Sequence, residues 1–314
     1  MKIAFFGTGD FSANILKSLL KDFKKDIEVS LVVSQPDKPV WRKKILEKTP
    51  VKIVAEENKI KILQPEKLKN NLEFFEELNS LSLDFIVVVA YGKIVPLEVL
   101  QAPKYWCINI HWSILPKYRW ASPIQESIKN WDEKTGLTIM YMAEGMDTWD
   151  ILKIEEVEIW ENDKTPDLFK KFEKIWPELL VNTLKWVLNW VIKWKKQNED
   201  DASYCSKISK SDWEVNFSKE SWRQIYNKFR AYYPWPWVYT YYKWKKLNFE
   251  EVELKDYFWE KNPWEVDKLN KKNIWIVCKD NKVLILKKLK LEWKKSVDII
   301  SFVNGNKEFL DYKF

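Results

Sequence analysis

The stretch KIAFFGTGDFSANILKSLL, residues 2–20, has the pattern of a strand, a tight turn and a helix. Its apolar start, Lys2–Phe6, predicts a buried strand, and the Gly-Thr-Gly at 7–9 predicts a tight turn after that strand. Apolar residues then return at helical spacing over Phe11–Leu20, and Val29–Val33 is a second apolar run. Strand, helix and strand in this order are typical of the start of a parallel, Rossmann-like α/β sheet.

The Gly-Thr-Gly turn is also part of the dinucleotide-binding fingerprint. The third glycine of that fingerprint is missing, because Phe11 and Ser12 follow Asp10. The second strand ends in Ser34 and Gln35 rather than in an acidic residue that could bind a ribose. The sequence therefore favours a plain strand-to-helix turn over a dinucleotide site.

The α/β pattern continues through the first two thirds of the chain. Buried strands are predicted at Phe85–Ala90, Cys107–Ile110, Leu137–Met142 and Ile151–Ile159, and helices at Pro50–Asn58, Glu66–Asn79, Ser122–Lys129 and Thr165–Trp194. A polar, acidic run, QNEDDA at 197–202, follows the last helix. We place a first domain at 1–195, a linker at 196–206 and a second domain at 207–314.

Short β-like runs separated by turn residues fill the second domain. They predict a small β-barrel-like (OB-like) fold, with strands at Val238–Tyr242, Leu247–Glu253, Ile274–Lys279 and Val283–Leu291. Residues 205–314 hold 23 basic and 15 acidic residues, whereas 1–204 hold 30 and 31. A basic domain on a neutral body favours a polyanionic partner such as nucleic acid; a lysine-rich, solvated surface is the alternative.

The composition also excludes several classes of protein. Apolar runs such as Phe85–Ala90 are too short to cross a bilayer, and the N-terminus lacks the pattern of a signal peptide, so we expect a cytoplasmic protein without a membrane partner. The three cysteines form no CxxC pair and are expected to be buried thiols. With His111 as the single histidine, we expect no metal site.

The chain has 20 Trp but only 6 Gly, whereas ordinary proteins contain roughly 7% Gly. Many of the Trp stand among turn formers, as in Asn130-Trp131-Asp132, where positive φ suits glycine and strains tryptophan. We hypothesise that most are glycines in the living protein, for example because a UGA codon that means Gly there is written here as Trp. A truly Trp-rich protein is the alternative.

The strand CINIH, residues 107–111, ends in two polar residues. Because side chains alternate along a strand, Asn109 and His111 share one face. In open parallel sheets, ligands bind beyond the carboxyl ends of the strands. An amide donor beside an imidazole can polarise a carbonyl group and stabilise a developing oxyanion. A satisfied polar pair at a strand end is the alternative.

Residues 109–125, NIHWSILPKYRWASPIQ, resemble the signature of the folate-dependent formyltransferases. Further resemblances are QPDKPVWR at 35–42, VVVAYGKIVP at 87–96 and EGMDTWDIL at 144–152. In the tail, RAYYPWPW at 230–237 resembles a motif of the members that act on methionyl-tRNA. The resemblance covers nearly the whole chain, and the family's glycines fall on Trp at 41, 106, 112, 120, 131, 149, 237 and 264.

This resemblance implies a formyl transfer from 10-formyltetrahydrofolate to the α-amino group of the methionine on initiator tRNA. It implies that Asn109 and His111 donate hydrogen bonds to the oxyanion that forms on the formyl oxygen. Asp147 is expected to move protons through a water and to orient His111. No metal is required by this chemistry.

The resemblance also implies the binding residues. Folate is expected near seven residues: Tyr91, Gly92, Ile94, Pro96, Ser113, Leu115 and Pro116. A basic loop with Arg42, Lys43 and Lys44 is expected to contact tRNA phosphates together with the basic tail domain. A monomer is expected.

Two other interpretations stay open at this point. A related enzyme that formylates an amino sugar nucleotide or glycinamide ribonucleotide would share Asn109, His111 and Asp147. A non-catalytic RNA-binding protein with a decayed enzyme domain would explain the Trp residues if they are genuine. The basic tail and loop argue against the first interpretation, and the retained polar trio argues against the second.

Overall fold

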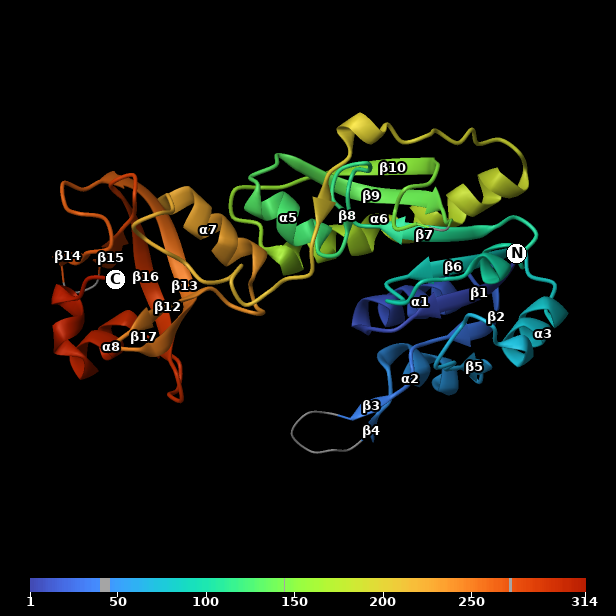
Figure 1. Ribbon diagram of the computed structural model, residues 1–314, viewed down its shortest axis with the longest axis horizontal. Helices are drawn as coiled ribbons and strands as arrows, with labels where there is room; N and C mark the ends of the chain where they lie inside the picture. The colour runs from blue at the N-terminus through green and yellow to red at the C-terminus, as the bar shows by residue number, and fades with distance from the viewer. Residues whose placement is uncertain (40–45, 144, 271–272) are drawn as a thin grey trace. The chain divides into compact units, whose positions relative to one another are not determined.

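The computed structural model describes residues 1–39, 46–143, 145–270 and 273–314 (Figure 1). These residues divide into two compact units. The first comprises Met1–Trp120, Gly136–Val157 and Lys171–Tyr204, and the second comprises Ala121–Thr135, Glu158–Lys170 and Cys205–Phe314. Each unit is described by itself.

A seven-stranded sheet in the order β10-β9-β7-β6-β1-β2-β5 organises the first unit. Its strands are β1 (Lys2–Gly7), β2 (Glu28–Val33), β5 (Ile62–Leu63), β6 (Phe85–Val89), β7 (Cys107–His111), β9 (Lys134–Tyr141) and β10 (Ile151–Glu158). The five strands from β5 to β7 run parallel, and β9 runs antiparallel to β7. The predicted Rossmann-like sheet is confirmed, with an antiparallel addition at one side.

The opening strand lies in the middle of this sheet, between β2 and β6. Every residue from Ile3 to Phe6 is fully buried, which explains the unbroken apolar run in the sequence. Helix α1 (Asp10–Asp22) follows the glycine turn and buries Ala13, Ile15, Leu16 and Leu19. This is the face that the helical spacing predicts, with Leu20 at its half-buried margin.

The first unit also holds α2 (Pro50–Glu57), α3 (Leu72–Ser80), α4 (Leu97–Leu100) and most of α6 (Thr165–Leu188), whereas α5 (Pro123–Lys129) falls in the second unit. Helix α3 begins six residues later than predicted, because the Asn71 side chain accepts a hydrogen bond from Phe74 N and so caps the helix. Helix α6 ends at Leu188 instead of Trp194. Short strands pair as β3 (Lys38–Pro39) with β4 (Leu46–Glu47), and as β8 (Arg119–Trp120) with β11 (Tyr204–Cys205).

The second unit contains a curled antiparallel sheet in the order β12-β13-β16-β15-β14, with β17 paired to β16. Its strands are β12 (Tyr239–Tyr242), β13 (Lys245–Phe258), β14 (Val266–Asn270), β15 (Asn273–Val277), β16 (Lys282–Leu291) and β17 (Val297–Asp298). The predicted β-barrel-like domain is confirmed as a half-barrel. It also holds α7 (Trp222–Ala231), α8 (Ile299–Gly305) and the 3-10 turn η2 (Lys307–Asp311) (Figure 1).

Helix α7 has a local start signal in its sequence. Ser221 and Gln224 form a capping box at its start. Its buried face includes Ile225 and Phe229. Within the described residues, no helix is long and apolar enough to span a membrane.

Gly136 on β9 provides a test of how tightly the sheet supports the loop after β7. A Cβ there would lie 2.5 Å from Glu155 O and 3.0 Å from Ile114 Cγ1. We expect Gly136→Ala to lower the free energy of unfolding by about 1–3 kcal/mol, because backbone and core must shift to admit the methyl group. Chemical denaturation measures this change.

Gly9→Ala is the matched control. A Cβ at Gly9 meets nothing within 4 Å, and the backbone φ of −85° suits alanine. Gly9→Ala should lower the free energy of unfolding by less than about 1 kcal/mol, because its only cost is that alanine is a poorer helix N-cap than glycine. Equal losses of unfolding free energy in the two variants would show that Gly136 is not tightly packed.

Candidate active site

Strand β7 presents the first two predicted catalytic residues at its carboxyl end. Asn109 is half-buried and His111 is 5% exposed. The neighbouring strand β6 runs parallel, with Val88 opposite Asn109. The loop that follows β6 therefore leaves the sheet at the same edge as His111, which is where ligands bind in such sheets.

Asp147 joins this pair from the loop between β9 and β10. Asn109 Nδ2 donates to Asp147 Oδ1 over 3.4 Å, and His111 Nδ1 lies 3.5 Å from Asp147 Oδ2. The structure thus brings together all three residues that the resemblance implies as catalytic. The same Oδ2 accepts a shorter hydrogen bond, 2.9 Å, from Trp120 N.

The orientation of the imidazole follows from its second contact. His111 Nε2 lies 2.9 Å from the carbonyl oxygen of Tyr118. Because a carbonyl oxygen can only accept, Nε2 carries a proton. Nδ1 therefore faces Asp147 with a lone pair when the ring is neutral, and with an N–H when the ring is protonated.

The residues after β7 are held by hydrogen bonds within the protein. Thr138 Oγ1 donates to Ser113 O over 2.6 Å and accepts from Leu115 N over 3.2 Å. Ser113 Oγ donates to Lys117 O over 2.5 Å. The side chains of Ser113 and Leu115 are buried, and Pro116 is half-buried. Their contact with folate stays a prediction, and the inward side chains favour a role in shaping the wall.

The predicted folate loop after β6 presents its residues in different ways. The Tyr91 ring is 2% exposed and packs on Phe6 with ring centroids 5.5 Å apart. Burial raises the pKa of Tyr91 to about 12. Gly92 is exposed and adopts a φ of 78°, Ile94 is 80% exposed and Pro96 is half-buried. The backbone and the apolar side chains after Tyr91 are therefore the groups open to a ligand.

The predicted tRNA contacts Arg42, Lys43 and Lys44 lie outside the described residues. The strands that flank them, β3 and β4, pair through Lys38 and Glu47. A hollow of about 600 Å³ opens beside this hairpin, and its lining includes the basic side chains Lys17, Lys38 and Lys48. Lys48 is paired with Glu56 at 2.7 Å.

Sequence reasoning missed two polar residues that support Asp147. Arg119 is fully buried and forms a two-pronged ion pair with Glu199, with both N–O distances 2.8 Å. This pairing raises the pKa of Arg119 and lowers that of Glu199. Gln197 bonds both Arg119 and the loop of Asp147. The available signal was the position of Arg119 within the family-like signature.

Within the described residues, the cysteines and the carboxylates offer no second site. Cys107, Cys205 and Cys278 are buried thiols, and burial raises the pKa of Cys107 and Cys278. Over the parts of the chain that the structure describes, no three His, Cys, Asp or Glu residues cluster so as to hold a metal ion.

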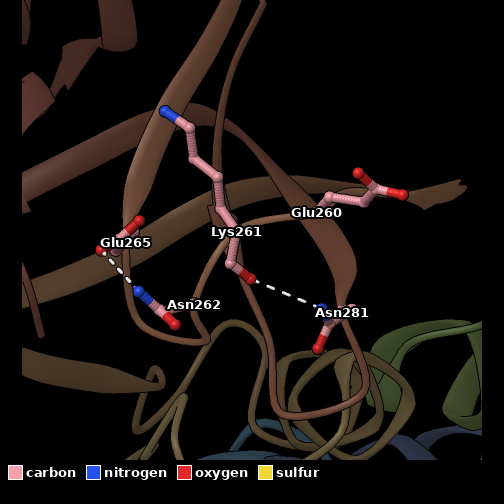
Figure 2. A pocket seen from close by; sticks show the side chains of 5 residues that line it. All are labelled: Glu260, Lys261, Asn262, Glu265 and Asn281. Atoms are coloured by element: carbon pink, nitrogen blue, oxygen red, sulfur yellow. Dashed lines mark hydrogen bonds between the residues drawn. The ribbon is translucent and has the colours of Figure 1, made fainter.

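A hollow of about 420 Å³ in the second unit is lined by Glu260, Lys261, Asn262, Glu265 and Asn281 (Figure 2). Asn262 Nδ2 donates to Glu265 Oε1 over 3.3 Å, and Asn281 Nδ2 donates to Lys261 O over 3.5 Å. These side chains hold turns together, and the hollow lacks the imidazole and carboxylate pairing found at the end of β7.

The comparisons with known proteins agree with this geometry. Residues 1–184 match the formyl transferase family, and residues 207–307 match the formyl transferase C-terminal domain. The chain is 43% identical to the methionyl-tRNA formyltransferase of Caldicellulosiruptor saccharolyticus over 98% of this chain and 97% of that protein. It is 39% identical to the methionyl-tRNA formyltransferase of Clostridium tetani over the same shares.

Among solved structures, the N-formyltransferase from Helicobacter canadensis in complex with folinic acid and dTDP-3-aminofucose has the same fold. The TM-score is 0.65 at 22% identity, over 91% of this chain and 98% of that chain. Matches to both domain families, together with relatives that align along almost the entire chain, establish that this chain belongs to the methionyl-tRNA formyltransferase family.

Proposed function

We propose that this chain transfers a formyl group from 10-formyltetrahydrofolate to the α-amino group of methionyl initiator tRNA. The observation that carries the proposal is the convergence of Asn109, His111 and Asp147 at the carboxyl edge of a parallel sheet. The names of the relatives supply the substrate class.

The folate supplies an electrophilic formyl carbon when it is bound. Asn109 Nδ2 then donates a hydrogen bond to the formyl oxygen, where negative charge develops as the amine attacks. A fixed donor in a partly buried position stabilises such a charge more than water does, because it needs no reorientation during the reaction. The 3.4 Å contact with Asp147 is long for a hydrogen bond, so Asn109 can exchange it for the formyl oxygen.

His111 and Asp147 act as a pair in which the carboxylate orients the imidazole and transfers protons. Nε2 of His111 is committed to Tyr118 O, so the expected second hydrogen bond to the formyl oxygen has to come from Nδ1. The Asp147 carboxylate faces Nδ1 at 3.5 Å and orients the ring. Asp147 also accepts, through a water, the proton that the attacking amine loses, and it returns a proton to the nitrogen that leaves.

The loop after β6 fits a folate ring. It leaves the sheet beside Asn109, and its exposed Gly92 and Ile94 offer backbone groups and an apolar surface. Flat heteroaromatic ligands are bound by this combination of apolar contacts with a few polar backbone groups. Tyr91 contributes its backbone and supports the loop from the core.

A tRNA substrate is favoured over a sugar nucleotide for two reasons. The full-length relatives at 39–43% identity are methionyl-tRNA enzymes, and the basic excess lies in residues 205–314. Basic surfaces bind polyanions through phosphate contacts. The proposal includes a monomer that acts in the cytoplasm.

Removing the donor at residue 109 should slow the reaction. We expect Asn109→Ala to lower kcat by about 100- to 1,000-fold, as for the loss of one oxyanion donor. Asp147→Asn should lower kcat by about 100-fold or more, because the proton acceptor is lost. Formylation of charged initiator tRNA by the full chain is the measurement.

Asn189→Ala is the control, because Asn189 is an exposed amide that bonds only its own helix in the described contacts, at Lys185 O. Formylation of an amino sugar nucleotide or of glycinamide ribonucleotide in place of tRNA would overturn the substrate assignment. Binding of tRNA with no formylation of any amine would favour the decayed RNA-binding protein.

Affinity for initiator tRNA should fall as salt rises, because phosphate contacts release counterions. Replacing Arg42, Lys43 and Lys44 together by Ala should reduce the slope of log Kd against log salt by about 2–3. Fluorescence anisotropy with labelled tRNA measures Kd at each salt concentration.

Replacing the exposed Lys21, Lys24 and Lys25 removes the same charge and should leave that slope unchanged. An affinity that stays flat across the salt titration would count against tRNA as the substrate. Equal slopes for the two triple variants would count against the basic loop.

A further inference from the structure

We propose that Gln197 is a positioning residue that holds the Asp147 loop in its reactive geometry, with Arg119 as its anchor. This inference rests on the proposed function of the Asn109, His111 and Asp147 trio. It also gives a role to the polar segment around residue 197, which composition alone presents as a linker.

The Gln197 amide spans the Asp147 loop. Its Nε2 donates to Asp147 O over 2.9 Å and to Trp149 O over 2.6 Å. Asp147 has a φ of 59°, a left-handed conformation that costs an L residue of order 1 kcal/mol or more unless its surroundings hold it. Two hydrogen bonds to one short turn supply that restraint.

The other end of the same amide is fixed by a buried cation. Gln197 Oε1 accepts from Arg119 Nη2 over 2.9 Å and from Arg119 Nε over 3.1 Å. Arg119 is in turn held by Glu199 and by the hydroxyl of Tyr204, 3.0 Å from Nη1. This pattern fixes the amide orientation, because the reverse would set Oε1 against two carbonyl oxygens and NH₂ against a guanidinium.

The same segment also supports the His111 side of the site. Arg119 N donates to Ser203 O over 2.8 Å, and Tyr118 N donates to Ser203 Oγ over 2.9 Å. Tyr118 O is the acceptor that fixes the His111 ring. Gln197 therefore restrains Asp147, and Ser203 restrains the residue whose carbonyl orients His111.

The substitution Gln197→Glu tests the positioning role separately from any effect on the stability of the fold. The carboxylate keeps both acceptor contacts with Arg119 and gains charge, but it loses both donors to the Asp147 loop. We expect kcat for formyl transfer to fall about 10- to 100-fold, as for a small misplacement of a catalytic group. The KM for folate and the melting temperature should stay close to wild type.

The neighbouring exposed amide is the control: Asn198 bonds Asp201 at 3.0 Å, and Asn198→Ala should leave kcat unchanged. In an Asp147→Asn background, adding Gln197→Glu should lower kcat by less than about a further threefold, because both substitutions act through residue 147. Two results would overturn the proposal. One is that Gln197→Glu lowers kcat by the same factor in the Asp147→Asn background as in the wild type, and the other is that Gln197→Glu alone has wild-type kcat.

Amide hydrogen exchange over residues 145–152 tests the same idea without catalysis. Gln197→Glu should speed exchange in this loop, and Asn198→Ala should not. A wild-type chain that transfers formyl to no amine would refute the proposed function, whereas unchanged exchange in Gln197→Glu would refute the positioning role.

A second inference comes from the backbone. Eight Trp in the described residues have φ between 57° and 81°: Trp106, Trp120, Trp131, Trp190, Trp237, Trp244, Trp264 and Trp293. We infer that these eight positions are glycine in the protein made by the source organism. Left-handed backbone is routine for glycine and strained for an aromatic residue.

Two of the positions end helices. Trp131 N bonds Ile128 O, and Asp132 N bonds Ser127 O, just after α5. The same pair of bonds follows α6, where Trp190 N donates to Val187 O and Val191 N donates to Trp186 O. Both are Schellman motifs, in which the left-handed position that follows the C-cap is usually glycine.

A third position closes a hairpin. Lys243 and Trp244 connect β12 to β13 and have φ of 48° and 63°. Two positive φ values in a two-residue loop are the mark of a type I′ turn, whose second residue is usually glycine. The indole of Trp244 is 96% exposed, and that of Trp293 is 90% exposed, so neither offsets its strain by burial.

Tandem mass spectrometry of the tryptic peptide Tyr105–Lys117 from the native protein tests this inference. Glycine at 106 is the expected result, and the peptide also reports residue 112 next to His111. Tryptophan at 106 would overturn the assignment for that position.

A recombinant chain offers a second measurement. Trp244→Gly and Trp293→Gly should each raise the melting temperature by about 2–4 °C, as relief of backbone strain predicts. Trp275→Gly, which empties a buried site at an ordinary φ, should lower it. A fall in all three variants would contradict the strain argument.

Discussion

The candidate site depends on a carboxylate carried by a left-handed residue. Asp147 adopts a φ of 59°, a conformation that needs support from its surroundings. That support comes from Trp120 N on the carboxylate and from Gln197 Nε2 on the carbonyl. Both donors belong to segments tied together by Arg119, so the buried guanidinium connects the two supports of Asp147.

Local patterns in the sequence were enough to predict the sheet and half of the site. The apolar run of β1 and its turn define a central strand, and alternation along β7 places Asn109 beside His111. Boundaries were less predictable where one side chain decides them. Asn71 shortens α3 by capping it, although the apolar pattern extends further back.

The remaining half of the site depends on contacts between distant parts of the chain. Gln197 lies 50 residues from Asp147 and 78 from Arg119, within a run whose polar composition is that of an exposed linker. No periodicity distinguishes such a glutamine from a solvated one. Likewise, a motif places Ser113 and Leu115 near the site but does not give the direction of their side chains, which point inward.

The two Trp residues near Asp147 take part in its support through main-chain groups rather than through their indole rings. Trp120 contributes its N–H and Trp149 contributes its carbonyl. Glycine at position 120 would provide the same donor at the same positive φ with less strain. The hydrogen bonds that position the carboxylate are therefore independent of the indole rings, so a site built around glycine would keep the geometry of the trio.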